Sequence, residues 1–139
     1  MRITTKEADN KKVNFSFKKE ERLCSKKVSE KLFAEGSSFL AFPLKIVYLK
    51  TTLPVEFPVQ AAFAVSKKNF KKAVQRNFIK RRMREGYRLN KHLLYDNLDA
   101  RQMAIFFIFI GKELPKYKLI EEAMKKGIKK LIDEVTTKT

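Results

Sequence analysis

One segment constrains the fold more than any other: residues 73–96 contain no proline and repeat apolar side chains at helical spacing. On a turn of 100° per residue, one broad side carries the apolar residues together with Gly86: Phe78, Ile79, Met83, Leu89 and Leu93. A narrower opposite arc is polar and cationic: Asn77, Lys80, Arg81, Arg84, Arg88 and Lys91. The segment therefore predicts one long helix with an apolar face toward a core and a cationic face outward. Arg82 breaks the pattern because it projects into the apolar arc.

This helix belongs to a strongly basic stretch of the chain. From Ser66 to His92 there are eleven lysines and arginines against one acid, Glu85, so this stretch supplies +10 of the formal net charge of +17. Cations four residues apart on a helix repel one another, and the surplus charge repels itself across the whole protein. We therefore expect a polyanionic partner, with nucleic acid as the leading candidate and an anionic membrane surface as the second.

The other segments alternate between helix and strand patterns. Ser25 is a suitable N-cap and Gly36 a suitable end for a short first helix. Residues 39–49 and 59–66 are typical of strands, and Pro43 indicates an edge position or a bulge in the first of them. Residues 103–110 are apolar throughout, as in a central strand covered on both faces. Residues 116–135 repeat apolar side chains at helical spacing.

These elements, in the order α-β-β-α-β-α, predict an α/β (α+β) two-layer sandwich. The length of 139 residues argues for one domain, which we place at residues 15–136. Residues 1–14 show no periodicity and are expected to form a flexible basic arm. There is no apolar run near the ~20 residues of a membrane-spanning helix, and no apolar signal stretch at the N-terminus.

The acidic and sulfur-containing residues give little support to catalysis by the protein itself. A metal-dependent nuclease needs clustered carboxylates to hold Mg²⁺, and the four aspartates are scattered: Asp9, Asp96, Asp99 and Asp133. We expect neither catalytic residues nor a metal site in the chain. Cys24 is the single cysteine, which we expect to be buried or half-buried, so no internal disulfide forms. These features favour the cytoplasm.

The stretch Ala62–Tyr87 resembles the signature of the bacterial ribonuclease P protein component. In that signature a strand ending in S-K-K is followed by R-N-x-x-K-R-x-x-R on a helix, and the letters fall on Ser66, Lys67, Lys68, Arg76, Asn77, Lys80, Arg81 and Arg84. A second set of motif residues precedes the first helix: Phe17, Lys19, Arg22 and Leu23. The chain departs from the usual R-N-R at Phe78, and it has Val28 and Ser29 where the family usually has an Asp-Phe pair.

The resemblance implies a protein subunit of a ribonucleoprotein that removes the 5′ leader from precursor tRNA. Hydrolysis would be performed by the RNA subunit and its Mg²⁺ ions, and the family fold implies a left-handed βαβ crossover around the basic helix. We expect the RNA subunit and precursor tRNA as partners, with no membrane and no required protein partner. The residues expected to bind RNA are Lys67, Lys68, Lys72, Arg76, Asn77, Lys80, Arg81, Arg84 and Arg88.

Family knowledge also places the leader strand in a cleft lined by aromatic side chains, formed by the sheet and the first helix. We place this lining at four residues, for each of which core packing is the alternative: Phe17, Phe33, Phe39 and Tyr48. The strongest rival function is a ribosomal RNA-binding protein with no role in tRNA processing. Its size, charge and fold class would look the same.

Overall fold

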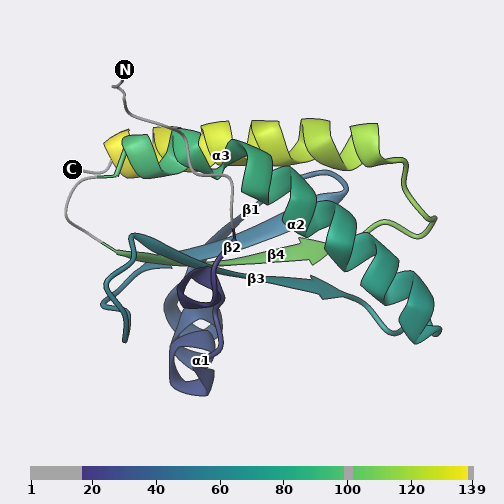
Figure 1. Cartoon of the computed structure of the whole chain (residues 1–139), viewed down its shortest axis with the longest axis horizontal. Helices are drawn as coiled ribbons and strands as arrows, with labels where there is room; N and C mark the ends of the chain where they lie inside the picture. The colour runs from purple at the N-terminus through teal and green to yellow at the C-terminus, as the bar shows by residue number, and fades with distance from the viewer. Residues whose placement is uncertain (1–16, 99–101, 138–139) are drawn as a thin grey trace, which may run out of the picture.

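The structure is a computed structural model that describes residues 17–98 and 102–137. A four-stranded sheet carries two long helices on one face and one short helix on the other (Figure 1). The predicted arm, residues 1–14, lies outside the described residues. In chain order the elements are η1 (Lys19–Glu21), α1 (Lys26–Glu35), β1 (Ser37–Ala41), β2 (Leu44–Lys50), β3 (Val59–Val65), α2 (Ala73–Asp96), β4 (Met103–Phe109) and α3 (Tyr117–Thr137).

Five of the six predicted elements are confirmed, and one is wrong. Residues 39–49 do not form one strand but belong to a hairpin, in which β1 and β2 are joined at Phe42 and Pro43. Proline has no N–H to donate to a strand ladder, so the apolar run turns back at this point. The first helix begins and ends as predicted: Ser25 Oγ accepts a hydrogen bond from Val28 N at 3.2 Å, and Gly36 is the C-cap.

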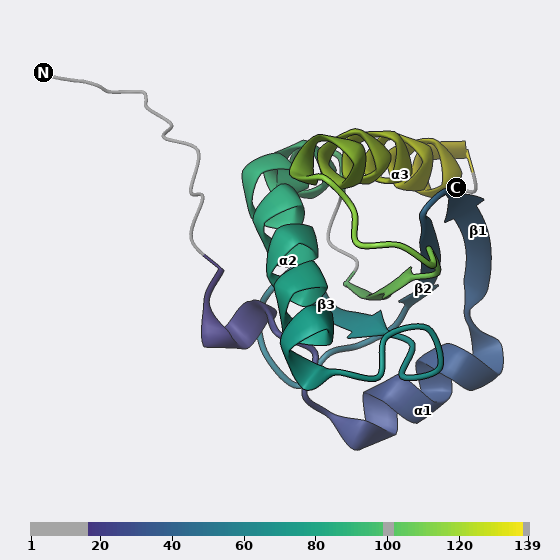
Figure 2. The same cartoon turned by 90° about the vertical axis from the view of Figure 1, so that its right-hand side faces the viewer.

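The strands lie in the order β1-β2-β4-β3, so β4 is central, as predicted. β1, β2 and β4 pair antiparallel, whereas β3 and β4 are parallel. Figures 1 and 2 show α2 returning across the sheet between β3 and β4. Seen from the helix side with both strands pointing away, β4 lies to the left of β3. The crossover is therefore left-handed, as the family resemblance implied and against the ~98% of such units that are right-handed.

Alternation along the strands divides the apolar side chains between the two faces of the sheet. The larger cluster lies against α2 and α3 and contains Ile46 and Phe107, which are register partners, with Phe63 packed against them. The smaller cluster lies against α1 and contains Leu32 and Val47. The two-layer prediction is confirmed for the main core, and α1 covers part of the second face.

The two edges of the sheet differ. Along β3, the segment before α1 supplies a short bridge: Leu23 N donates to the carbonyl of Ala61 at 2.9 Å, and Arg22 pairs with Ala61. Gln60 Nε2 also donates to the carbonyl of Glu20 at 3.0 Å. The N-terminal segment thus covers the β3 edge, while β1 forms the opposite edge.

Candidate nucleic-acid interface

A row of cations faces solvent along the first half of α2 and the loop that precedes it. Lys67, Lys68, Lys72, Arg81 and Arg84 are exposed, and Lys80 is half-buried. Within the described ranges, none of these six charged groups makes an ion pair with an acid of the chain. Asn77, on the same side of the helix, is also exposed. This set of six cations and Asn77 is called the basic face below.

The S-K-K turn at the end of β3 has a defined conformation. Ser66 Oγ accepts a hydrogen bond from the backbone N of Lys68 at 3.1 Å, and the Ser66 carbonyl accepts one from Phe70 N at 3.1 Å. The Phe70 side chain is buried and packs against Phe109 of β4. The serine of the motif therefore holds the turn, so that the lysines that follow point to solvent.

Arg76, which we predict to bind RNA, lies at the junction between this loop and α2 and also has a structural role there. Its Nη1 donates to the carbonyls of Phe70 and Lys71, both at 2.8 Å, and the residue is half-buried. A guanidinium has five N–H donors, so the groups that remain can still meet a phosphate. The motif arginine thus ties the loop to the first turn of α2, a function that linear spacing alone does not reveal.

Arg88 marks the end of the basic face. Its Nη2 lies 2.6 Å from Glu85 Oε2, and its Nε donates to Glu85 Oε1 at 3.1 Å. The hydrogen bond from Arg88 holds the pKa of Glu85 below its usual value, against a smaller effect of burial. The single acid of the basic stretch therefore neutralises the arginine beside it.

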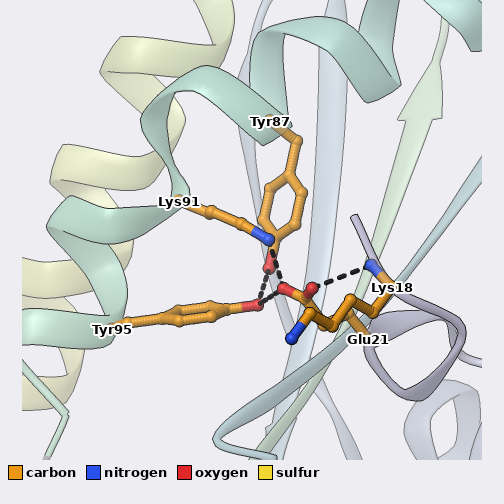
Figure 3. Close-up of polar contacts among 5 residues, drawn as sticks. All are labelled: Lys18, Glu21, Tyr87, Lys91 and Tyr95. Carbon is orange, nitrogen blue, oxygen red and sulfur yellow. Dashed lines mark hydrogen bonds and ion pairs between the residues drawn. The ribbon is translucent and has the colours of Figure 1, made fainter. Parts of the chain in front are cut away.

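Lys91 was predicted on the cationic arc, and that prediction is wrong. Its side chain is buried, and its Nζ contacts Glu21 Oε1 of η1 (Figure 3). Tyr95 Oη donates to the same oxygen at 2.7 Å, and the backbone N of Lys18 donates to Glu21 Oε2 at 2.9 Å. The hydroxyl of Tyr87 lies 3.3 Å from that of Tyr95. This buried cluster joins η1 to the second half of α2.

The chemistry of the buried cluster favours a charged Glu21. Burial raises the pKa of the carboxyl, but the hydrogen bonds from Lys18 N, Lys91 and Tyr95 together outweigh it, so the pKa is lowered. Burial raises the pKa of Tyr87 and of Tyr95, so both remain protonated donors. The sequence alone does not predict this cluster, because Glu21 lies 70 residues away from Lys91 in the chain.

Arg82, which does not fit the helical pattern, lies over the ring of Phe78, the residue at which the chain departs from the family motif. The carbon at the centre of its guanidinium lies 4.7 Å from the ring centroid of Phe78 and 5.8 Å from that of Tyr117. Phe78 packs against the main core, as its side of the helix predicted. A cation over an aromatic face is favourable, so Arg82 stabilises the contact between α2 and the start of α3.

The structure does not bring the four predicted cleft residues together. Tyr48 is only 7% exposed and donates from its hydroxyl to Glu134 of α3 at 2.8 Å, and Phe39 packs beside it. Phe17 packs edge-on against Phe63 and Tyr87 beneath α2. The prediction of one cleft lined by all four is wrong, because strand alternation directs Phe39 and Tyr48 to the face covered by helices. Phe33 alone lies on the α1 side.

A different aromatic surface lies beside α1. Phe33 is 54% exposed, and the centroid of its ring lies 5.0 Å from the ring centroid of Phe106 in β4. Phe106 and Ile108 are half-buried, and their register partners on β3 are the small residues Ala62 and Ala64. This surface is called the α1-side surface below, and β3 leads from it to the S-K-K turn. In this surface, alanines on one strand lie beside large residues on the neighbouring strand. The sequence could indicate this arrangement only if the register of the two strands were known.

The thiol, the metal-ligating side chains and the helices of the described residues were each a possible basis for a further function. Cys24 is exposed, which corrects the expectation of a buried or half-buried thiol. Over residues 17–98 and 102–137 no three side chains of the His, Cys, Asp and Glu types group together to hold a metal ion. Among the described helices, none combines the length and apolarity needed to cross a membrane.

Comparison with known proteins decides the family. Residues 17–132 match the sequence model described as Ribonuclease P. The chain belongs to the ribonuclease P protein family. This confirms the resemblance drawn from the S-K-K and R-N-x-x-K-R-x-x-R motifs. Ribonuclease P proteins are components of an endoribonuclease that is a ribonucleoprotein.

Relatives match over most of their length. The ribonuclease P protein component of Porphyromonas gingivalis is 38% identical over 123 residues, which cover 87% of this chain and 90% of that protein. The corresponding protein of Chlorobium phaeobacteroides is 36% identical over 119 residues, covering 77% and 82%. The solved RNase P protein of Staphylococcus aureus superposes with a TM-score of 0.60 at 18% identity, covering 80% of this chain and 94% of that one, and it supports the fold.

Proposed function

We propose that this ribonuclease P protein binds the RNA subunit through the basic face of α2 and assists removal of the 5′ leader from precursor tRNA. The observation that carries the proposal is the basic face itself: six cations with no acidic partner in the described chain, arranged along one side of a helix and its preceding turn. A phosphate backbone supplies the missing charge. At ~0.7 to 0.9 per neutralised phosphate, six contacts give a slope of log K against log salt of about −4 to −5.

The α1-side surface is the proposed contact for the leader strand. Phe33 and Phe106 present aromatic rings, and the small β3 residues beside them leave space over the sheet. Base stacking on such rings contributes ~1 to 3 kcal/mol per base and tolerates any sequence. That tolerance suits a protein that handles many different leaders. The S-K-K turn at the end of β3 supplies cations next to this surface.

We assign hydrolysis to the RNA subunit, with Mg²⁺ held by RNA and substrate. The described residues offer no group of three metal-ligating side chains, so no step of the reaction is assigned to a protein carboxylate. The proposal needs the RNA subunit and precursor tRNA as partners, requires no protein partner, and places the activity in the cytoplasm.

The test is reconstitution of leader removal with ribonuclease P RNA at low Mg²⁺ concentration. We expect the purified protein to restore cleavage, and Arg81→Ala/Arg84→Ala to restore much less of it at the same protein concentration. Lys118→Ala/Lys125→Ala on α3 is the matched control, because it removes the same charge from exposed positions outside the basic face. No restoration by the unaltered protein, together with tight binding to ribosomal RNA, would favour the ribosomal alternative.

A further inference from the structure

The outer edge of β1 is open. Within the described chain no strand pairs with its outer side, whereas the β3 edge is bridged by the segment before α1. Figure 2 shows β1 at the outside of the molecule, at the far end of the sheet from α2. Proteins usually protect an edge with lysine, proline or a bulge. Ser37–Ala41 contains no charged residue and no proline.

Apolar side chains and a cavity accompany this edge. Leu40 is 60% exposed and Phe42 is 70% exposed. A cavity of about 350 Å³ lies at the end of β1, where the hairpin turn meets the end of β4 and the first turn of α3; its apolar lining includes Phe42, Pro43, Ile110 and Leu119. One side chain of a bound molecule would fit in it.

α3 runs alongside β1 and adds positive charge. A β-carbon at Gly127 would lie 3.8 Å from Cβ of Ala41, and Lys130 Nζ lies 4.9 Å from the ring centroid of Phe39. Lys126 lies one turn before Lys130 on the same side of α3, and both lysines are exposed. The edge therefore has two exposed lysines of α3 on one side, followed one turn later by Glu134, whose carboxylate accepts a hydrogen bond from Tyr48. At its end lies a largely apolar cavity, whose lining also includes Lys112 and Glu113.

These three features select one kind of occupant. A second copy of this chain would bring the same lysines opposite one another on a protein of net charge +17, which opposes self-association. The sugar-phosphate backbone of a nucleic acid has no alternating N–H and C=O groups that could continue the hydrogen-bond ladder of a strand edge. We propose that the β1 edge binds an extended acidic peptide segment of another protein, which adds a strand to the sheet, places carboxylates near Lys126 and Lys130, and inserts an apolar side chain into the cavity.

This partner is accessory to the proposed function, since the edge and the basic face lie at opposite ends of the sheet. The two proposals can therefore fail separately. Leader removal with ribonuclease P RNA tests the first, and peptide binding by the full chain tests the second.

The probe is a synthetic peptide about six residues long, the usual length of a strand, in which glutamate and valine alternate and phenylalanine stands at one end. Titration into the isotopically labelled full chain, followed by NMR, is expected to shift the amide signals of residues 37–42 and 119–130. A peptide with lysine in place of each glutamate is the control and is expected to bind much more weakly.

Variants locate the contacts. Lys126→Glu/Lys130→Glu is expected to weaken binding about fivefold, from two exposed ion pairs, while Lys118→Glu/Lys125→Glu on the same helix leaves it unchanged. Phe42→Ser alters an exposed residue and is expected to weaken binding without loss of the folded NMR spectrum. The proposal is overturned if the acidic peptide does not bind, or if the lysine peptide binds equally well. It is also overturned if short oligouridylate RNA shifts the β1 signals, or if these signals change with protein concentration alone.

Discussion

Lys91 of α2 and Glu21 of η1 form an ion pair in which both side chains are almost fully buried, 3% and 2% exposed, although 70 residues separate them in the chain. The pair fixes the N-terminal segment against α2 and so helps to hold the bridge from Arg22 to Ala61 at the β3 edge. One lysine of the basic stretch therefore serves the fold and is not available to RNA.

Replacing Lys91 by alanine is expected to lower the free energy of unfolding by about 3–5 kcal/mol, because it leaves a buried carboxylate without its cation. Urea denaturation measures the loss. Lys80→Ala, which removes a lysine that makes no ion pair in the described chain, is the control and should change stability little. In a double-mutant cycle, Lys91→Met/Glu21→Gln should lower the free energy of unfolding by clearly less than the sum of the losses caused by the two single substitutions. Strict additivity would show that the two groups do not interact.

The stability of the protein is expected to fall as the pH drops below the ordinary glutamate pKa of 4.5, partly because of Glu21. The folded-state pKa of Glu21 is lowered, so its contribution is fully present above pH 4.5 and is lost as the pH falls through the folded-state pKa. Glu21→Gln removes the titrating group. Its unfolding free energy should therefore change less steeply with pH over this window than that of the unaltered chain. Parallel curves for the two proteins would argue against a lowered pKa.

Salt dependence distinguishes the cations of the basic face from those engaged inside the protein. Arg81→Ala/Arg84→Ala is expected to reduce the slope of log K against log salt by about two units, one for each phosphate that is no longer neutralised. Arg88→Ala should change the slope by less than one unit, because Glu85 already neutralises this arginine. Filter binding to ribonuclease P RNA at several salt concentrations measures both. A slope reduction by Arg88→Ala that is half as large as that of Arg81→Ala/Arg84→Ala would mean that the ion pair between Arg88 and Glu85 opens on binding.

Arg76→Ala is expected to destabilise the loop before α2 as well as to weaken RNA binding through the loss of a positive charge. Its guanidinium donates to two loop carbonyls, so its removal should lower the free energy of unfolding by about 1–2 kcal/mol. It should also raise amide hydrogen exchange at residues 67–71. Asn77→Ala, at the next position and exposed, is the control and should leave exchange in the loop unchanged. A loop with unaltered exchange in Arg76→Ala would restrict this arginine to a direct role in RNA binding.

Phe33→Ala and Phe106→Ala are expected to weaken the binding of precursor tRNA by roughly 1–3 kcal/mol for each base that no longer stacks, with little effect on mature tRNA, which has no leader. Competition binding with the assembled ribonucleoprotein gives the two affinities. Tyr48→Phe is the control: it removes the hydroxyl that bonds Glu134, so it should affect stability and leave the preference for precursor tRNA intact. An equal loss of affinity for precursor and mature tRNA in Phe33→Ala would show that the leader does not contact Phe33.

Local patterns predicted most of the fold. α2 occupies residues 73–96 as predicted, because helical spacing of apolar residues with no proline leaves few alternatives. The hairpin at Phe42 and Pro43 was missed because the turn has neither glycine nor asparagine, and the apolar residues on both sides resemble one continuous strand. Pro43 marks an interruption of the run, but the sequence alone does not distinguish a bulge there from a reversal of the chain.

The site was predictable only in part. The exposed cations of α2 follow from their side of the helix, but Lys91 does not, since its partner comes from the other end of the chain. The prediction that four aromatic residues line one cleft is wrong for a related reason. Which face Tyr48 or Phe106 occupies depends on strand register, and a shift of one residue exchanges the two faces.

The division of the sheet into two apolar clusters has a consequence for divergence within the family. Side chains on the α1 side pack in a cluster separate from the one under α2 and α3. Substitutions among Phe33, Phe106 and Ile108 therefore leave most of the buried volume untouched. Evolution or design can remodel the α1 side of this scaffold while the opposite side preserves its architecture.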